Sequence, residues 1–154
     1  MKIALAQIDT TVGDFKGNRK KIEDSLVRAG SRGVDLVVFP EMAVTGYPVG
    51  GLLNQSKFIS DNLKCLDRIV QKISDTAAII GYVRQVPRAA GKPLENVAAL
   101  ISNREIVSTH VKSALGVYST FDEYNYLEPS GNVSVADFGE LKLGICFFDD
   151  ILPG

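Results

Sequence analysis

The feature that most constrains the fold is a pair of short apolar segments separated by an amphipathic helix pattern. Residues 2–8 and 36–39 are apolar on both faces, as strands buried on both sides of a sheet are, and Pro40 stops the second segment. Between them, apolar side chains recur at helical spacing over residues 18–29, with Asn18 as the expected N-cap. Because parallel strands need a crossover connection, usually a helix, this order predicts a strand–helix–strand unit.

The rest of the chain continues this alternation and then changes to antiparallel patterns. We expect a helix over residues 57–74, a third strand over 77–83, a polar turn region over 84–93 and a long irregular loop over 113–130. Two hairpins are expected, 97–102 with 105–112 and 133–138 with 141–148, around the turns Asn103-Arg104 and Gly139-Glu140. This order predicts an α/β fold with a mixed, α+β-like sheet and helices packed on one face.

Length and charge limit the possible partners. At 154 residues the chain is long enough for one domain with one hydrophobic core. Its formal net charge is −1, which provides no field to attract nucleic acid or anionic lipid. No apolar run approaches the ~18 residues that span a membrane, and the N-terminus lacks the pattern of a signal peptide. We therefore expect a cytoplasmic protein that binds neither nucleic acid nor membrane.

The cysteine and histidine content limits the chemistry. Cys65 and Cys146 are too few for a disulfide scaffold and lack the spacing of metal ligands. His110 is the single histidine and cannot build a metal site alone. A zinc enzyme and a Ser-His-Asp hydrolase are therefore both disfavoured, and no metal site is expected.

Two charged residues stand at the ends of expected strands, Glu41 and Lys112. Low dielectric at a buried strand end raises the pKa of a carboxyl group, which would suit Glu41 as a general base. Lys112 could present a fixed positive charge to a developing oxyanion. Taken alone, each residue fits a solvated side chain at a strand end better, because most glutamates and lysines are exposed.

A loop and a cysteine provide the remaining candidates. Residues 116–123 carry aromatic and acidic side chains that could line a pocket, and Glu123 could orient Lys112 through a hydrogen bond. Cys146, near the exit of an expected strand, could act as a nucleophile if a nearby cation stabilises its thiolate. The alternative for Cys146 is a buried inert thiol, which is the commoner state of a free cysteine.

The order and spacing of these signals resemble the nitrilase (carbon–nitrogen hydrolase) superfamily. The resemblance rests on Lys2–Gln7, Asp35–Glu41, Thr45–Pro48, Lys112 and Phe121–Glu123. Thr11–Phe15, and the position of Lys112 six residues before Tyr118, are similar to the branch formed by the glutaminase domains of glutamine-dependent NAD synthetases. The resemblance runs over the whole chain but covers only a little more than the first half of that domain.

The resemblance implies a fold and a chemistry. The fold is a nitrilase-type α-β-β-α sandwich, of which residues 1–154 would form the N-terminal part. The synthetase domain, with its ATP and Mg²⁺, would be absent, and the amidase part needs no cofactor. Such enzymes use a Glu-Lys-Cys triad in which the cysteine thiolate attacks an amide, here glutamine or a similar small amide, and the released ammonia supports NAD synthesis. By resemblance Glu41 is the general base, Lys112 the triad lysine, Glu123 its supporting carboxylate and Tyr118 the residue that contacts glutamine.

The sequence departs from the family at the nucleophile. The family pattern reads roughly Gly-x-x-x-Cys-Glu-Asp-Ile-Trp, and an ungapped alignment places Phe148 at the cysteine position and Leu152 at the tryptophan position. Cys146 lies two residues earlier, so on a strand it would share a face with Phe148 but sit about 6–7 Å back. A displacement of that size should remove most of the rate.

Three functions therefore stay open. The first is glutamine amide hydrolysis by a truncated glutaminase. The second is a catalytically inactive fragment or pseudoenzyme that acts as a binding or structural module, and the third is another nitrilase-type amidase. The chain ends soon after an apolar strand, which predicts an incompletely covered core, and hence a homo-oligomer or a complementing domain.

Overall fold

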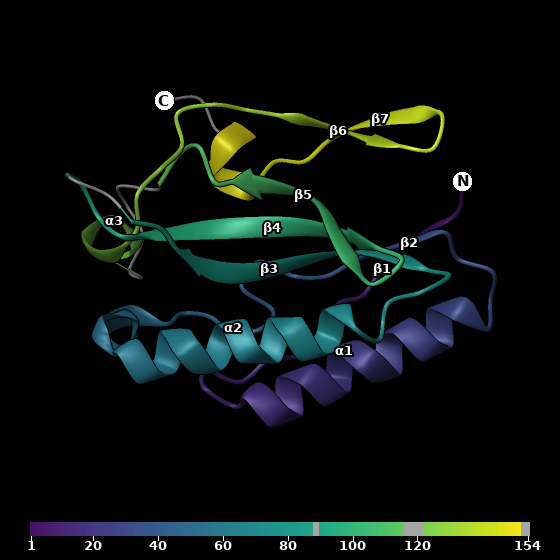
Figure 1. The fold of residues 1–154 in the computed structure, drawn as a ribbon, viewed down its shortest axis with the longest axis horizontal. Helices are drawn as coiled ribbons and strands as arrows, with labels where there is room; N and C mark the ends of the chain where they lie inside the picture. Colours follow the sequence, from purple (N-terminus) through teal and green to yellow (C-terminus); the bar gives the residue numbers. More distant parts are fainter. Residues whose placement is uncertain (88–89, 116–121, 152–154) are drawn as a thin grey trace.

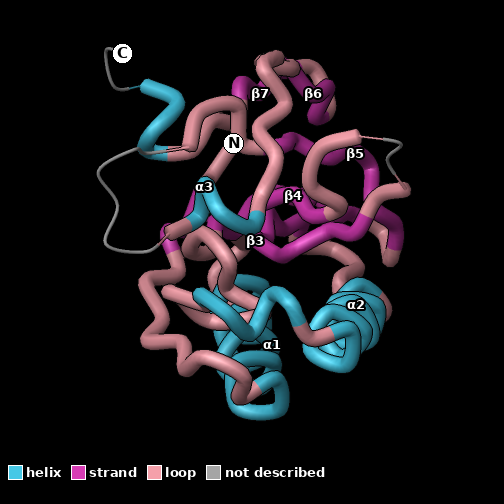
Figure 2. The backbone as a smooth tube through the Cα atoms, turned by 90° about the vertical axis from the view of Figure 1, so that its left-hand side faces the viewer, coloured by secondary structure: helices cyan, strands magenta, loops and turns pink. Residues whose placement is uncertain are grey.

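The computed structural model describes residues 1–87, 90–115 and 122–151 as a five-stranded sheet between a helical layer and a small hairpin (Figure 1). In chain order the elements are β1 (Ile3–Leu5), α1 (Phe15–Gly30), β2 (Leu36–Val38), the 3-10 turn η1 (Gly50–Asn54), α2 (Ser56–Val70), β3 (Ala77–Gln85), β4 (Leu94–Ser102), β5 (Glu105–Val111), α3 (Glu123–Tyr126), β6 (Val135–Phe138), β7 (Leu141–Gly144) and the 3-10 turn η2 (Phe148–Ile151). Helices α1 and α2 cover one face of the sheet, and the β6–β7 hairpin lies over the other (Figure 2).

The large sheet is mixed, as predicted. Its strand order is β1-β2-β3-β4-β5, with parallel pairing of β1 with β2 and of β2 with β3, and antiparallel pairing from β3 onward. The parallel pairs follow from the crossover helices α1 and α2. The β4–β5 hairpin turns at Asn103 and Arg104, both with positive φ (51° and 64°), which is the backbone of the tight turns that match strand twist.

The predicted start of the first helix is wrong. Helix α1 begins at Phe15, and its N-cap is Asp14, whose carboxylate accepts a hydrogen bond from Gly17 N at 2.9 Å. Asn18 lies inside the helix and is fully buried. Its amide donates to the carbonyl oxygens of Thr11 and Val44, at 2.8 and 3.2 Å, so it ties the helix to two loops instead of capping it.

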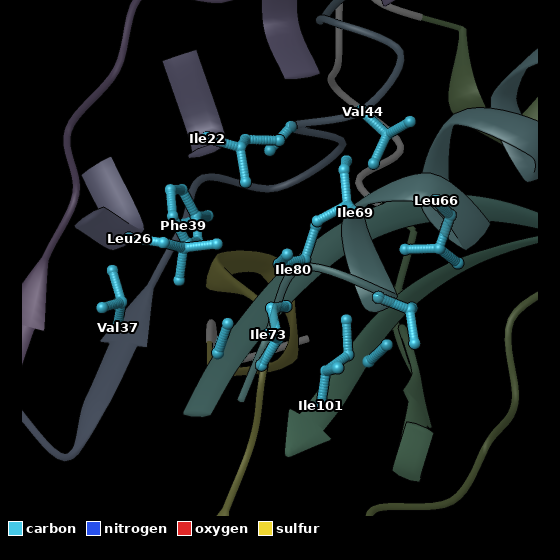
Figure 3. Close-up of a cluster of buried hydrophobic side chains, with 14 of the residues drawn as sticks. Ile22, Leu26, Val37, Phe39, Val44, Leu66, Ile69, Ile73, Ile80 and Ile101 are labelled. Carbon is cyan, nitrogen blue, oxygen red and sulfur yellow. The ribbon is translucent and has the colours of Figure 1, made fainter. Parts of the chain in front are cut away.

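The main core lies between the helices and the sheet. Apolar side chains from α1 and α2 meet those of β2, β3 and β4 there (Figure 3), and the labelled members are Ile22, Leu26, Val37, Phe39, Val44, Leu66, Ile69, Ile73, Ile80 and Ile101. Alternation along each strand sends every second side chain into this layer. Strands with apolar residues on both faces therefore need a second apolar layer on the opposite side.

That second layer is small. Leu36, Ile79 and Leu100 point away from the helices and contact Ala136 of β6 and Phe147. The hairpin covers only part of this face, and a hollow of about 480 Å³ lies between the sheet and residues 143–148. None of the described helices is both long and apolar enough to cross a membrane.

The expected strand over residues 141–148 is only half correct. Strand β7 ends at Gly144, and the chain then turns into η2. The cause is Asp150, whose Oδ2 accepts from Phe147 N at 2.9 Å and whose Oδ1 accepts from Ser113 N and Ala114 N at 2.8 Å each. These bonds hold the end of the described chain against the segment after β5, so an extended continuation is excluded.

Other parts of the prediction also differ from the structure. Arg84, expected in a polar turn, belongs to β3 because it pairs across the strands with Glu95, with a side-chain hydrogen bond of 2.9 Å. The expected irregular loop over residues 113–130 contains the short helix α3. Helix α2 also ends four residues earlier than predicted, at Val70.

Candidate active site

Lys112 is the centre of a buried ion cluster. It directly follows β5, its backbone N donates to the Asn96 carbonyl at 2.9 Å, and only 1% of its surface is exposed. The ammonium Nζ lies 2.9 Å from Glu41 Oε1, 2.7 Å from Glu123 Oε2 and 2.5 Å from Asp149 Oδ2. An ammonium has three hydrogens, so each of them has a carboxylate acceptor.

Glu41 reaches the cluster from the carboxyl end of β2. The backbone of residues 40–42 passes very close to β3 at Gly81, where an added Cβ would lie 2.3 Å from Met42 N. Glycine at this position therefore lets the Glu41 segment lie against the sheet. Phe39 N donates to Ile79 O at 3.0 Å and Val44 N to Gly81 O at 3.1 Å, which fix the segment on either side of Glu41.

Asn96 of β4 also holds Glu41. Its Nδ2 donates to Glu41 Oε1 at 2.5 Å, and its side chain is buried. The register that pairs Val97 with Val111 sets Asn96 beside Lys112 on the sheet face opposite the helices. Two neighbouring strands thus supply two donors to one carboxylate oxygen.

The cluster changes the acidity of its members. Burial raises the pKa of Glu41 above its usual value, although the charge of Lys112 partly offsets this rise. Burial alone would lower the pKa of Lys112, but hydrogen bonds to Asp149 and Glu123 and the charge of Glu41 raise it. Burial and the charges of Glu123 and Glu41 raise the pKa of Tyr47, so this phenol stays protonated at neutral pH.

Glu41 borders two hollows. The apolar hollow on the open sheet face is also lined by Ala98, Cys146 and Phe148. A second hollow, of about 500 Å³, is bordered by residues 7–10 and by Tyr47. Glu41 can therefore be reached by a small molecule, whereas Lys112 lies behind it.

The structure brings three of the predicted site residues together, Glu41, Lys112 and Glu123. Lys112 is not the solvated strand-end lysine of the simpler interpretation, and its predicted hydrogen bond to Glu123 is present. Tyr118 lies outside the described residues.

Cys146 and Phe148 both line the apolar hollow, and both are exposed, Phe148 to 68%. The alternative in which Cys146 is buried is therefore wrong. The expectation that the two residues share one strand face is also wrong, because residues 145–147 are irregular and Phe148 begins η2.

Sequence reasoning missed Asn96 and Asp149. Asn96 is buried in β4 directly before five apolar residues, and a polar side chain at a buried strand position is a usable signal of a hydrogen-bonded site. Asp149 stands in the pattern that resembles the family, directly after Phe148, but only the folded geometry shows its contact with Lys112. Within the described residues no group of side chains is arranged to hold a metal ion.

The family model for carbon-nitrogen hydrolases matches residues 2–152. The chain belongs to the carbon–nitrogen hydrolase family. Among its curated relatives, glutamine-dependent NAD(+) synthetase of Thermotoga maritima is 33% identical over 153 residues, which are 98% of this chain and 26% of that protein. This carbon–nitrogen hydrolase chain thus spans about a quarter of the length of that relative.

Solved structures agree with this carbon–nitrogen hydrolase fold. Glutamine-dependent NAD+ synthetase of Acinetobacter baumannii superposes with a TM-score of 0.83 at 27% identity, over 92% of this chain and 26% of the other. An amidase from Nesterenkonia sp. superposes with a TM-score of 0.75 at 22% identity, over 94% of this chain and 54% of the amidase. The second likeness concerns the fold alone.

Proposed function

We propose that residues 1–154 form the N-terminal part of a glutaminase-type domain that hydrolyses the amide of glutamine or of a similar small molecule. The observation that supports this most directly is the buried contact of Lys112 with Glu41 and Glu123, which joins residues from three separate parts of the chain. The names of the relatives, glutamine-dependent NAD(+) synthetases, support glutamine as the amide. In such a protein the ammonia would pass to NAD synthesis.

In the proposed reaction Glu41 accepts a proton from a cysteine thiol. The thiolate attacks the amide carbonyl carbon, the C–N bond breaks, and ammonia leaves with the proton that Glu41 returns. Water, deprotonated by Glu41, then attacks the thioester carbonyl, so the acid is released and the thiol regains its proton. Lys112 provides a fixed positive charge behind the base, and the raised pKa of Glu41 suits a group that must take up and return protons.

Cys146 is the proposed nucleophile, because it is exposed and shares the apolar hollow with Glu41. Iodoacetamide at low concentration should label Cys146 before Cys65, which is buried between the helices and whose pKa is raised by burial. Glutamine should slow the labelling, and ammonia release should be lost in Cys146→Ala and Glu41→Gln. Equal labelling of both cysteines, with no ammonia released, would remove the proposal.

A second function, a non-catalytic binding or structural module, is favoured by one observation. Phe148 occupies the position that the family pattern gives to the nucleophile, and it lies directly before Asp149, the third partner of Lys112. In this case the ion cluster stabilises the fold, and the chain releases no ammonia from glutamine or from any small amide tested. Ammonia release that requires Glu41 would exclude this function.

We also propose that the chain self-associates in the cytoplasm. Large apolar side chains are exposed on the hairpin side of the molecule, namely Val133, Val135, Leu141, Phe148 and Ile151. Such a grouping marks association surfaces. Light scattering should show dimers or larger species, and a monodisperse monomer would contradict this proposal.

A further inference from the structure

Asn62 and Asn96, two of the three buried asparagines among the described residues, differ in how their amides are used. Asn62 of α2 donates from Nδ2 to Val83 O at 2.6 Å and accepts at Oδ1 from Val83 N at 3.4 Å, so both ends of its amide bind the backbone of β3. Asn96 binds no backbone group with its side chain among the described residues; its Nδ2 donates to Glu41, and its Oδ1 is buried with no hydrogen-bond partner there.

An unpaired buried amide oxygen is costly, so a residue kept only for packing or stability should be apolar at that place. Position 96 lies on the sheet face where β4 otherwise presents Ala98 and Leu100. Leucine has the same branching and the same number of side-chain heavy atoms as asparagine, and it would leave no polar atom unpaired. The contact that distinguishes asparagine from leucine here is the 2.5 Å bond to Glu41.

That bond has a directional consequence. Asn96 Nδ2 and Lys112 Nζ both donate to Oε1 of Glu41, and neither engages Oε2. Two donors from adjacent strands restrict the orientation of this carboxylate more than one donor alone would. The Glu41 side chain remains 29% exposed, where it borders the two hollows.

We infer that Asn96 is a positioning residue. It holds Oε1 of Glu41 so that Oε2 faces the apolar hollow that Cys146 also lines. The inference rests on the proposed role of Glu41 as the base, and it adds a residue to which no role has been assigned. Because the amide donates to the charged form of the carboxylate, it also favours ionised Glu41 against the effect of burial.

The test compares Asn96→Leu with Asn62→Leu in the full chain. The carboxyl ¹³C shift of Glu41 is followed against pH by NMR and is assigned by its absence in Glu41→Gln. Asn96→Leu should raise the pKa of Glu41, with a roughly tenfold fall in its ionisation constant, because one hydrogen bond to a charged group is lost. Asn62→Leu should leave the Glu41 titration unchanged and lower the thermal midpoint, because it loses two buried hydrogen bonds.

Asn96→Ala is titrated alongside, so that the comparison does not depend on how well leucine packs, and it should shift Glu41 in the same direction. An unchanged Glu41 titration in the folded Asn96 variant, or an equal shift in Asn62→Leu, would overturn the inference. Ammonia release is measured separately on the unmodified chain. Its absence would remove the proposed function while the titration still decides whether Asn96 holds Glu41.

Discussion

Replacement of Lys112 by methionine should destabilise the chain strongly. The side chain length is nearly kept, but three carboxylates within 2.9 Å lose their common cation, and one of them, Glu123, is only 4% exposed. Removal of one partner from a buried ion pair typically costs about 3–5 kcal/mol. For a domain of this size that cost corresponds to a fall in the thermal midpoint of roughly 6–20 °C.

Circular dichroism melts at pH 7 measure this change. The folded-state pKa of Lys112 is raised above 10.5, so its stabilisation is fully present at pH 7 and is lost only as pH rises through that folded value. The gap between the parent chain and Lys112→Met should narrow towards pH 4, because Glu41, whose pKa is raised by burial, takes up a proton and no longer needs the cation.

Lys142→Met is the matched control. Its ion pair with Asp137 has a similar length, 2.8 Å, but both side chains are about four-fifths exposed, so the loss should stay under about 1 kcal/mol. A midpoint for Lys112→Met within 2 °C of the Lys142→Met value would refute the conclusion that the Lys112 cluster is buried and mutually stabilising.

Three further predictions use other members of the site. Glu41→Gln should raise the thermal midpoint at pH 7 and lose this advantage near pH 4. Because the folded pKa of Glu41 is raised above 4.5, the folded state holds the proton more tightly than the unfolded state, and ionisation of Glu41 lowers stability as pH rises from 4.5 through the folded pKa. A lower midpoint at pH 7 would contradict this sign. Asp150→Ala should cost about 1–3 kcal/mol in urea unfolding at pH 7, since three backbone N–H groups lose their acceptor. Although burial alone would raise the pKa of Asp150, these bonds lower it, so the stabilisation by Asp150 should fade only as pH falls below about 3.8. An unchanged unfolding midpoint at pH 7 would count against the role of Asp150 in turning the chain. Phe148→Cys should cost little stability because Phe148 is 68% exposed. It should increase ammonia release from glutamine if the nucleophile belongs at the family position. A folded Phe148→Cys protein with no increase in ammonia release would favour Cys146 as the nucleophile, or a non-catalytic chain.

Much of the fold could be predicted because its signals are local. The apolar segment 36–39 and the helical stripe before it specify a parallel crossover, and Asn103-Arg104 specifies a tight hairpin. The failures occur where side chains bind distant backbone. Asn18 has the chemistry of a cap, but its amide fits the carbonyls of Thr11 and Val44, and sequence spacing does not record that fit.

The candidate site divides in the same way. Glu41 and Lys112 could be predicted from their place in the ordered family pattern, whereas a strand-end position alone fits a solvated side chain better. Asp149 could not be placed, because its position depends on the turn that Asp150 makes after β7, which is a tertiary effect on a segment that is apolar enough to continue as a strand. The nucleophile could not be placed for the same reason, since the turn separates Cys146 from the strand geometry expected for it.

The charge of the cluster explains why Glu41 suits a base whichever residue is the nucleophile. Three carboxylates surround one ammonium, so the fully ionised cluster carries two negative charges in excess, close together and largely out of water. One added proton relieves part of this repulsion, and burial raises the pKa of Glu41, which is also the member that borders both hollows. In the proposed reaction, Lys112 would act on a bound substrate through its charge and not through a free N–H, because all three of its hydrogens have carboxylate acceptors. The proposed proton acceptor and the fixed charge are thus present together, and the reaction proposed for Cys146 requires its sulfur to reach Oε2 of Glu41.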